Sequence, residues 1–142
     1  PGIMEAANRG AKEGGGPSVG FTISLPFEQK TNEYVTDEIP FSFFSIRKTI
    51  LSHGAEVFVF FPGGYGTMDE LFERLTLIQT KKIPQIPIFL IGTEFWTPLI
   101  EVVKMQLLEK YATINAEDLN IFTLTDDIGL VVEAAKNTPE RT

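Results

Sequence analysis

The stretch VFVFFPGGYGTMDE, residues Val57–Glu70, decides the fold of this chain. Its opening run, Val57–Phe61, is entirely apolar. Such a run is too short for a helix and too apolar for a half-exposed strand, so it predicts a buried parallel strand. A glycine-rich loop over Pro62–Thr67 follows at once, and a helix is expected over Met68–Lys81. We therefore expect a buried strand that leads through a glycine loop into a helix.

The glycine loop lies where a phosphate is commonly bound. Its glycines, Gly63, Gly64 and Gly66, allow positive φ angles and close approach to the backbone. The first turn of a helix has N–H groups without intrahelical acceptors and a partial positive charge, so loop and helix together form a phosphate cradle. The pattern matches neither the P-loop nor the dinucleotide-binding motif. The alternative is a tight turn without a ligand, in which Thr67 and Glu70 form a capping box.

The segments on either side alternate between helices and strands. Helices are expected over Ile3–Lys12, Phe43–His53, Phe95–Lys110 and Ile128–Lys136, strands over Ser18–Leu25, Ile86–Ile91 and Ile121–Leu124, and a polar loop over Gln29–Pro40. This alternation predicts an α/β fold, a single Rossmann-like domain over residues 1–142 with a parallel sheet and helices on both faces. Ligands of such sheets bind beyond the carboxyl ends of the strands, which is where the glycine loop lies.

Composition and charge narrow the functions that the chain can have. Hydrophobic residues make up 43% of it, and no apolar run approaches the length of about 20 residues that spans a bilayer. With no cysteine and one histidine, His53, neither a metal nor a cofactor is expected. The net charge of -7 argues against a nucleic-acid partner, but a small phosphate ligand needs only local donors. No secretion signal is visible, so we expect a cytoplasmic protein without a membrane partner.

Arg47 lies in an unusual position for a charged residue. Its neighbours at helical spacing are all apolar, namely Phe43, Ile50 and Leu51. A buried, unpaired guanidinium costs on the order of several kcal/mol, so Arg47 is expected to meet a carboxylate or an anionic ligand. Glu70 is the carboxylate that the sequence offers, and Lys48 lies at the edge of the same helix face. The alternatives are a structural Arg–Glu salt bridge, or an arginine that extends along the helix to water.

The motif PGGYGTMDE of residues 62–70, with Arg47 and Lys48 upstream, resembles the signature of the Lonely Guy family. These proteins are cytokinin-activating phosphoribohydrolases that were formerly labelled lysine decarboxylases. Further matching stretches are PGIMEAAN at residues 1–8, Ser18–Gln29 with its ending LPFEQ, and TLIQT at residues 76–80. The resemblance covers most of the chain. It implies that the family's N-terminal strand or strands precede Pro1, so that the chain is a fragment of a longer nucleotide-binding domain.

The resemblance implies hydrolysis of the N-glycosidic bond of AMP or a cytokinin nucleotide, giving free base and ribose 5-phosphate. The transition state of such a reaction is oxocarbenium-like, and an anionic Glu70 would stabilise its positive charge and orient the attacking water. Arg47 would bind Glu70 and the substrate. Arg47 and Glu70 are therefore the expected catalytic residues. Arginine is a poor proton donor, so no general acid is assigned.

The resemblance also implies a set of substrate contacts. These are Met4, Glu5, Glu28, Arg47, Lys48, Gly63, Gly64, Tyr65, Gly66, Thr67, Met68, Asp69, Glu70 and Thr76. Glu28 is expected at the base, although it also fits a solvated loop acid. Thr76 also fits an ordinary helical position, Met4 a core residue, and Glu5 a first-turn acid.

A second function fits the same residues: a non-enzymatic carrier or sensor of a phosphate-bearing ligand, as in related proteins that carry the molybdenum cofactor. The pair Arg47 and Glu70 favours the enzyme, because a carrier needs the loop but not that pair. The resemblance further implies a homodimer or larger homo-oligomer. The helix after the loop has an apolar face, Leu71, Leu75 and Ile78, which would form the subunit contact or face the sheet.

Overall fold

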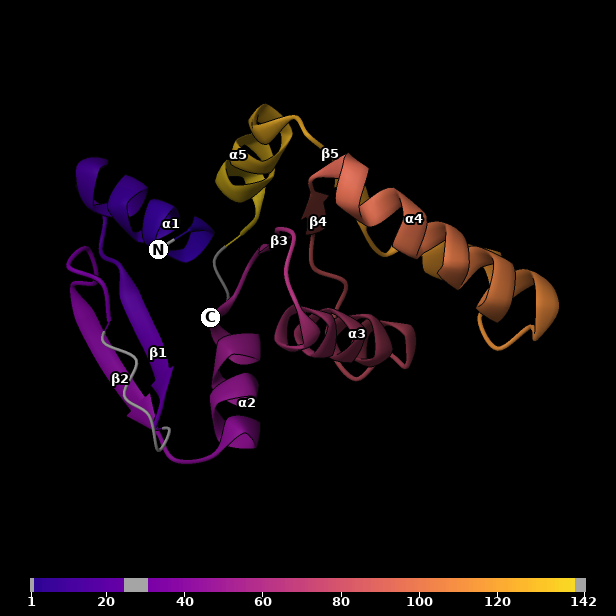
Figure 1. Cartoon of the computed structure of the whole chain (residues 1–142), viewed down its shortest axis with the longest axis horizontal. Helices are drawn as coiled ribbons and strands as arrows, with labels where there is room; N and C mark the ends of the chain where they lie inside the picture. The colour runs from indigo at the N-terminus through magenta and orange to yellow at the C-terminus, as the bar shows by residue number, and fades with distance from the viewer. Residues whose placement is uncertain (1, 25–30, 140–142) are drawn as a thin grey trace. The chain divides into compact units, whose positions relative to one another are not determined.

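The computed structural model describes residues 2–24 and 31–139 of the chain (Figure 1). The chain forms two compact units, Pro1–Gly54 and Ala55–Thr142. Each unit contains a parallel sheet with helices packed beside it. The predicted α/β class with parallel strands and flanking helices is therefore confirmed. The single domain expected over residues 1–142 stays a prediction.

The first unit joins a pair of helices to a pair of parallel strands in the described residues. Its elements are α1 (Ile3–Glu13), β1 (Val19–Ile23), β2 (Asp37–Phe41) and α2 (Phe44–Gly54). β1 pairs with β2, with Val19 opposite Asp37, and α2 packs against both strands. The Ser18 hydroxyl donates to Asn8 Oδ1 at 3.0 Å and so links α1 to the start of β1. Both helices agree with the predicted boundaries to within one residue.

Strand β2 lies where the sequence predicted a polar loop over residues 29–40, so that prediction is wrong from Asp37 onward. Aspartate, glutamate and proline are rare in strands, which hides this element in the sequence. Pro40 is tolerated because β2 is an edge strand of the sheet that the described residues form. The Ser18 carbonyl accepts from the amides of Thr36 and Asp37, at 2.7 and 3.3 Å, and so starts the parallel pairing.

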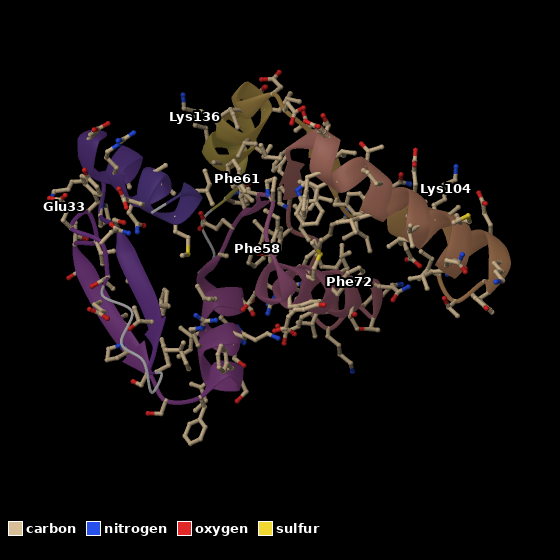
Figure 2. The ribbon with its side chains drawn as sticks, viewed as in Figure 1. Glu33, Phe58, Phe61, Phe72, Lys104 and Lys136 are labelled. Carbon is tan, nitrogen blue, oxygen red and sulfur yellow. The ribbon has the colours of Figure 1, made fainter. Side chains whose placement is uncertain are left out.

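The second unit alternates strands and helices. Its elements are β3 (Phe58–Phe60), α3 (Tyr65–Gln79), β4 (Ile88–Ile91), α4 (Thr93–Val103), the π-helical η1 (Lys104–Lys110), the short 3-10 helix η2 (Ala116–Asn120), β5 (Thr123–Thr125) and α5 (Ile128–Asn137). The strands lie in the order β3-β4-β5 and pair in parallel. Figure 2 labels Phe58, the first residue of β3, and Phe61, which follows its last residue.

Some boundaries in this unit differ from the predictions. Helix α3 begins at Tyr65 rather than Met68, because a glycine is tolerated in the first turn of a helix. β5 begins at Thr123 rather than Ile121, because Ile121 packs into the core just after η2. β3 is not wholly buried, since Val59 is 37% exposed. This strand has a partner on only one side of the described sheet.

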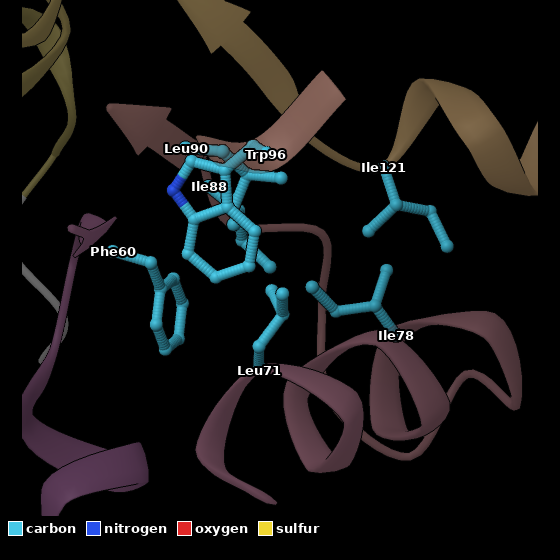
Figure 3. Close-up of a cluster of buried hydrophobic side chains, with 7 residues drawn as sticks. All are labelled: Phe60, Leu71, Ile78, Ile88, Leu90, Trp96 and Ile121. Carbon is cyan, nitrogen blue, oxygen red and sulfur yellow. The ribbon is translucent and has the colours of Figure 1, made fainter. Parts of the chain in front are cut away.

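The core of the second unit lies between α3, the sheet and the start of α4 (Figure 3). Its buried members are Phe60, Leu71, Ile78, Ile88, Leu90, Trp96 and Ile121. Leu71 and Ile78 are 1% and 7% exposed, so the apolar face of α3 packs inside this unit. Trp96 donates its indole N–H to the Ile91 carbonyl at 3.1 Å, which satisfies a buried donor. The core thus fixes α3 and α4 against the strands that precede them.

Candidate functional site

The turns after β3, β4 and β5 lie at one edge of the sheet in the second unit, because the strands are parallel. Residues 61–64 follow β3, Gly92 follows β4, and Asp126 and Asp127 follow β5. Each turn leads directly into the N-terminus of a helix, which carries a partial positive charge. The edge therefore gathers the N-termini of α3, α4 and α5, at the place where open α/β sheets bind ligands.

Helix α3 begins inside the glycine loop. Its N-cap is Gly64, which has extended backbone angles and no side chain to cap the helix. The Met68 amide donates to the Gly64 carbonyl at 3.1 Å. This is the first hydrogen bond of the helix. The amides of Tyr65, Gly66 and Thr67 come before Met68 in the chain, so they have no acceptor within the helix and face its N-terminal end. The capping box of Thr67 and Glu70, considered as the alternative to a phosphate cradle, is not formed, because Thr67 lies inside the first turn and Gly64 is the N-cap.

The loop glycines fall into two classes. A Cβ added at Gly63 would lie 2.8 Å from Thr67 Cβ and closer still to its Oγ1, so only glycine fits beneath this threonine. A Cβ added at Gly64 or Gly66 would have no neighbouring atom within 4 Å in the part of the chain that the structure describes. Gly63 therefore serves close packing, whereas Gly64 and Gly66 leave the backbone open on its outer side. This arrangement exposes amide donors to an incoming group.

The N-termini of the two neighbouring helices are capped by carboxylates. Asp126 Oδ1 accepts from the amides of Gly92 and Thr93 at 2.8 and 2.9 Å, and its Oδ2 accepts from the Thr93 hydroxyl. Asp127 Oδ1 accepts from the Gly129 amide at 2.8 Å and caps α5. The hydrogen bond from the Thr93 hydroxyl and then those from the two amides hold the pKa of Asp126 below its usual value of 3.8.

The three helices differ in whether an anionic side chain already caps the N-terminus. At α4 and α5 an anionic side chain occupies the N-terminus, as expected from helix capping. At α3 the N-cap is a glycine, and the first-turn glycine has open space beside it. An anion supplied from outside is therefore best accommodated at α3. A phosphate suits such a terminus, because its oxygens accept several backbone N–H groups at once.

The other predicted contacts on α3 differ in exposure. Tyr65 is 96% exposed and Asp69 is exposed, whereas Glu70 is partly buried. Met68 packs against the hydrophobic core. Thr76 is exposed and donates its hydroxyl to the Phe72 carbonyl at 2.7 Å, as helical threonines commonly do. Their roles at a ligand stay predictions.

The remaining predicted residues belong to the first unit. Arg47 and Lys48 are partly buried on α2, and the Arg47 guanidinium lies 5.3 Å from the centre of the Phe44 ring. The apolar stripe expected around Arg47 is less buried than predicted. Met4 is 72% exposed on α1, where Glu5 is partly buried. The structure brings Gly63–Glu70 together in one unit but does not test the pairing of Arg47 with Glu70, and Glu28 lies outside the described residues.

Arg74 is a buried charged residue that sequence analysis missed. It is 1% exposed, its Nη2 lies 2.5 Å from Glu73 Oε2, and its guanidinium lies 5.6 Å from the centre of the Phe58 ring. The spacing of Leu71, Arg74 and Ile78 places all three on the core face of α3 and is the signal that could have found it. Arg74 links α3 to β3, the two elements that the glycine loop connects.

No helix within residues 2–24 and 31–139 is long and apolar enough to cross a membrane. In the same part of the chain, histidine and acidic side chains form no group of three or more that could hold a metal ion.

Comparison with known proteins agrees with the glycine motif. A family model described as "Possible lysine decarboxylase" matches residues 4–135. The chain is also 28% identical over 141 residues to a rice protein (Oryza sativa subsp. japonica) named cytokinin riboside 5'-monophosphate phosphoribohydrolase LOG. That alignment covers 98% of this chain and 57% of the rice protein, so the chain spans little more than half the length of this relative.

Proposed function

The chain belongs to the Lonely Guy family, and from this premise we propose that the protein hydrolyses the N-glycosidic bond of nucleoside 5′-monophosphates. In the proposed reaction, water adds to C1′ of the ribose as the bond from C1′ to the base breaks. The products are the free base and ribose 5-phosphate. The proposed substrates are AMP and cytokinin nucleotides, the latter being the class in the name of the rice relative.

The observation that carries this proposal is the N-terminus of α3. Its first amides have no intrahelical acceptor, its N-cap is a glycine, and the two helices beside it already have carboxylate caps. A 5′-phosphate placed there would accept from the amides of Tyr65, Gly66 and Thr67 and would benefit from the helix dipole. Binding the phosphate in this way would place the ribose near the first turns of α3.

The catalytic part of the proposal rests on Glu70 and Arg47. Glu70 lies in the second turn of α3 and is partly buried. A carboxylate close to a ribose bound through its phosphate would stabilise an oxocarbenium-like transition state and orient the attacking water. Arg47 would bind Glu70 and the substrate and would hydrogen-bond the departing base.

The label of the family model points to lysine decarboxylation, which fits these residues poorly. That chemistry uses pyridoxal phosphate, held as a Schiff base on a lysine of the protein. No lysine occurs in residues 61–80, and the turns after β4 and β5 contain only Gly92 and Asp126-Asp127 before their helices. The edge that presents the phosphate-binding amides thus lacks the lysine that a pyridoxal enzyme needs, and no step is assigned to that cofactor.

The proposal is tested by incubating the complete protein with AMP and measuring free adenine by chromatography. We expect adenine and ribose 5-phosphate in equal amounts. Glu70→Gln should abolish turnover while changing the affinity for ribose 5-phosphate by less than about twofold, because the phosphate contacts remain. Glu101→Gln, which alters an exposed carboxylate on α4, is the control and should keep wild-type turnover.

The outcomes separate the enzyme from the alternative function. AMP that binds without any release of adenine would replace the enzyme by a carrier or sensor of phosphate-bearing ligands. Full activity in Glu70→Gln would remove Glu70 from the mechanism. A protein that neither binds nor cleaves AMP would contradict both functions.

A further inference from the structure

The capping carboxylate of Asp126 connects the end of β5 to the turn after β4. Asp126 accepts both amides of the turn, Gly92 at 2.8 Å and Thr93 at 2.9 Å, as well as the Thr93 hydroxyl. Gly92 has φ 101° and ψ 68°, a left-handed conformation that disfavours side chains. The carboxylate thus holds this glycine turn in place through three hydrogen bonds.

Gly92 in turn lies against the first residue of the glycine loop. A Cβ added at Gly92 would lie 2.9 Å from Pro62 Cγ and 3.1 Å from its Cδ, so the proline ring packs directly on the glycine backbone. Pro62 is followed by Gly63, which packs beneath Thr67 in the first turn of α3. Asp126 is therefore linked to the first turn of α3 by successive contacts. It bonds to Gly92, which packs on Pro62, and Pro62 leads to Gly63 beneath Thr67.

We propose that Asp126 is a positioning residue for the phosphate, acting through Gly92 and Pro62 on the glycine loop. The inference rests on the proposed function for the identity of the ligand. A loop with three glycines at residues 63, 64 and 66 has high conformational freedom, which an anion must restrict on binding. A fixed support behind Pro62 reduces that freedom before the ligand arrives, and such preorganisation increases affinity without a new contact.

Asp127 provides a matched control. It is the adjacent carboxylate on the same turn and also caps a helix, but its Oδ1 accepts from the Gly129 amide of α5 rather than from the turn at Gly92. Asp126→Ala and Asp127→Ala thus each remove a capping carboxylate, and only the first removes the support of the glycine loop. A purely structural role for Asp126 predicts similar effects of the two substitutions.

The first measurement is the kinetics of AMP hydrolysis by the complete protein. We expect Asp126→Ala to raise KM about tenfold with kcat within about twofold, because phosphate contacts are made in the ground state and the transition state alike. Asp127→Ala should keep KM within about twofold of the wild type. Asp126→Asn retains Oδ1 as an acceptor and should raise KM less than Asp126→Ala; it also replaces the alanine variant if that variant fails to fold.

The second measurement does not require activity. Hydrogen–deuterium exchange of peptides covering residues 62–68 should be faster in Asp126→Ala than in the wild type and unchanged in Asp127→Ala. Equal KM values in the wild type and Asp126→Ala, or equal increases in both alanine variants, would overturn the inference even if AMP hydrolysis is observed. If the wild type neither binds nor cleaves AMP, the proposed function fails, and unchanged exchange in residues 62–68 of Asp126→Ala would then overturn the positioning role as well.

Discussion

Alanine at Gly63 is expected to destabilise the second unit, whereas alanine at Gly66 is not. The added Cβ at Gly63 would lie 2.8 Å from Thr67 Cβ and 3.2 Å from its Cγ2, and nearest of all to its Oγ1. Gly63 does not have a positive φ, so the cost is steric rather than conformational. Overpacking of this kind lowers the free energy of unfolding by about 1–3 kcal/mol. At Gly66 the Cβ meets open space, and replacing a helical glycine by alanine raises that free energy by up to about 1 kcal/mol.

Thr67 determines most of this difference. The substitution Thr67→Ala removes Oγ1 and Cγ2 but keeps Cβ, so it should restore roughly half of the stability lost in Gly63→Ala. The assay is urea unfolding followed by the fluorescence of Trp96, which is 1% exposed in the core of the unit that contains the loop. Wild-type stability of Gly63→Ala, or equal losses in Gly63→Ala and Gly66→Ala, would refute the close packing on which this reasoning depends.

Two further predictions concern charged residues of the second unit. The folded state lowers the pKa of Asp126 below 3.8, so the stability that this carboxylate contributes is complete above pH 3.8 and is lost as the pH falls through the lowered value. Urea midpoints measured below pH 3.8 should therefore fall less steeply in Asp126→Asn than in the wild type, and parallel curves would contradict this. Arg74→Ala should lower the free energy of unfolding by about 2–4 kcal/mol, because it empties a core position and removes the contact with Phe58. Lys104→Ala, at an exposed ion pair with Glu109 in the same unit, should change it by less than about 1 kcal/mol, and equal effects of the two substitutions would refute the core role of Arg74.

The strand, loop and helix around the glycine motif could be predicted from sequence because each is a local pattern. An apolar run marks β3, and glycines mark the turn that follows it. Helix α3 begins at Tyr65, three residues before the predicted start at Met68, because glycine is a poor former of helix interiors and its presence predicts a loop. Strand β2 was missed for the opposite reason, since its residues DEIPF rarely form strands.

The candidate site was only partly accessible to sequence analysis. The amides at the start of α3 follow from the motif, since the first turn of any helix presents them. The support behind the loop does not, because Asp126, Gly92 and Pro62 come from three turns that are far apart in the sequence. The burial of Arg74 is not expected from sequence, because the other residues on the core face of α3, Leu71 and Ile78, are apolar. The pairing of Arg47 with Glu70, expected from the apolar neighbours of Arg47 and from the family resemblance, stays a prediction.

The two carboxylates that cap α4 and α5 also have a consequence for ligand selection. Asp126 accepts from the amides of Gly92 and Thr93, and Asp127 accepts from that of Gly129, so carboxylates already occupy the N-termini of α4 and α5. A single phosphate can be bound by the amides of α3 alone. A second phosphate on the same ligand would find the amides at the other two helix N-termini of this edge already bonded to Asp126 and Asp127. The caps of the neighbouring helices would thus leave helix-terminal amides for one phosphate at this edge, which is the number that the proposed monophosphate substrates carry.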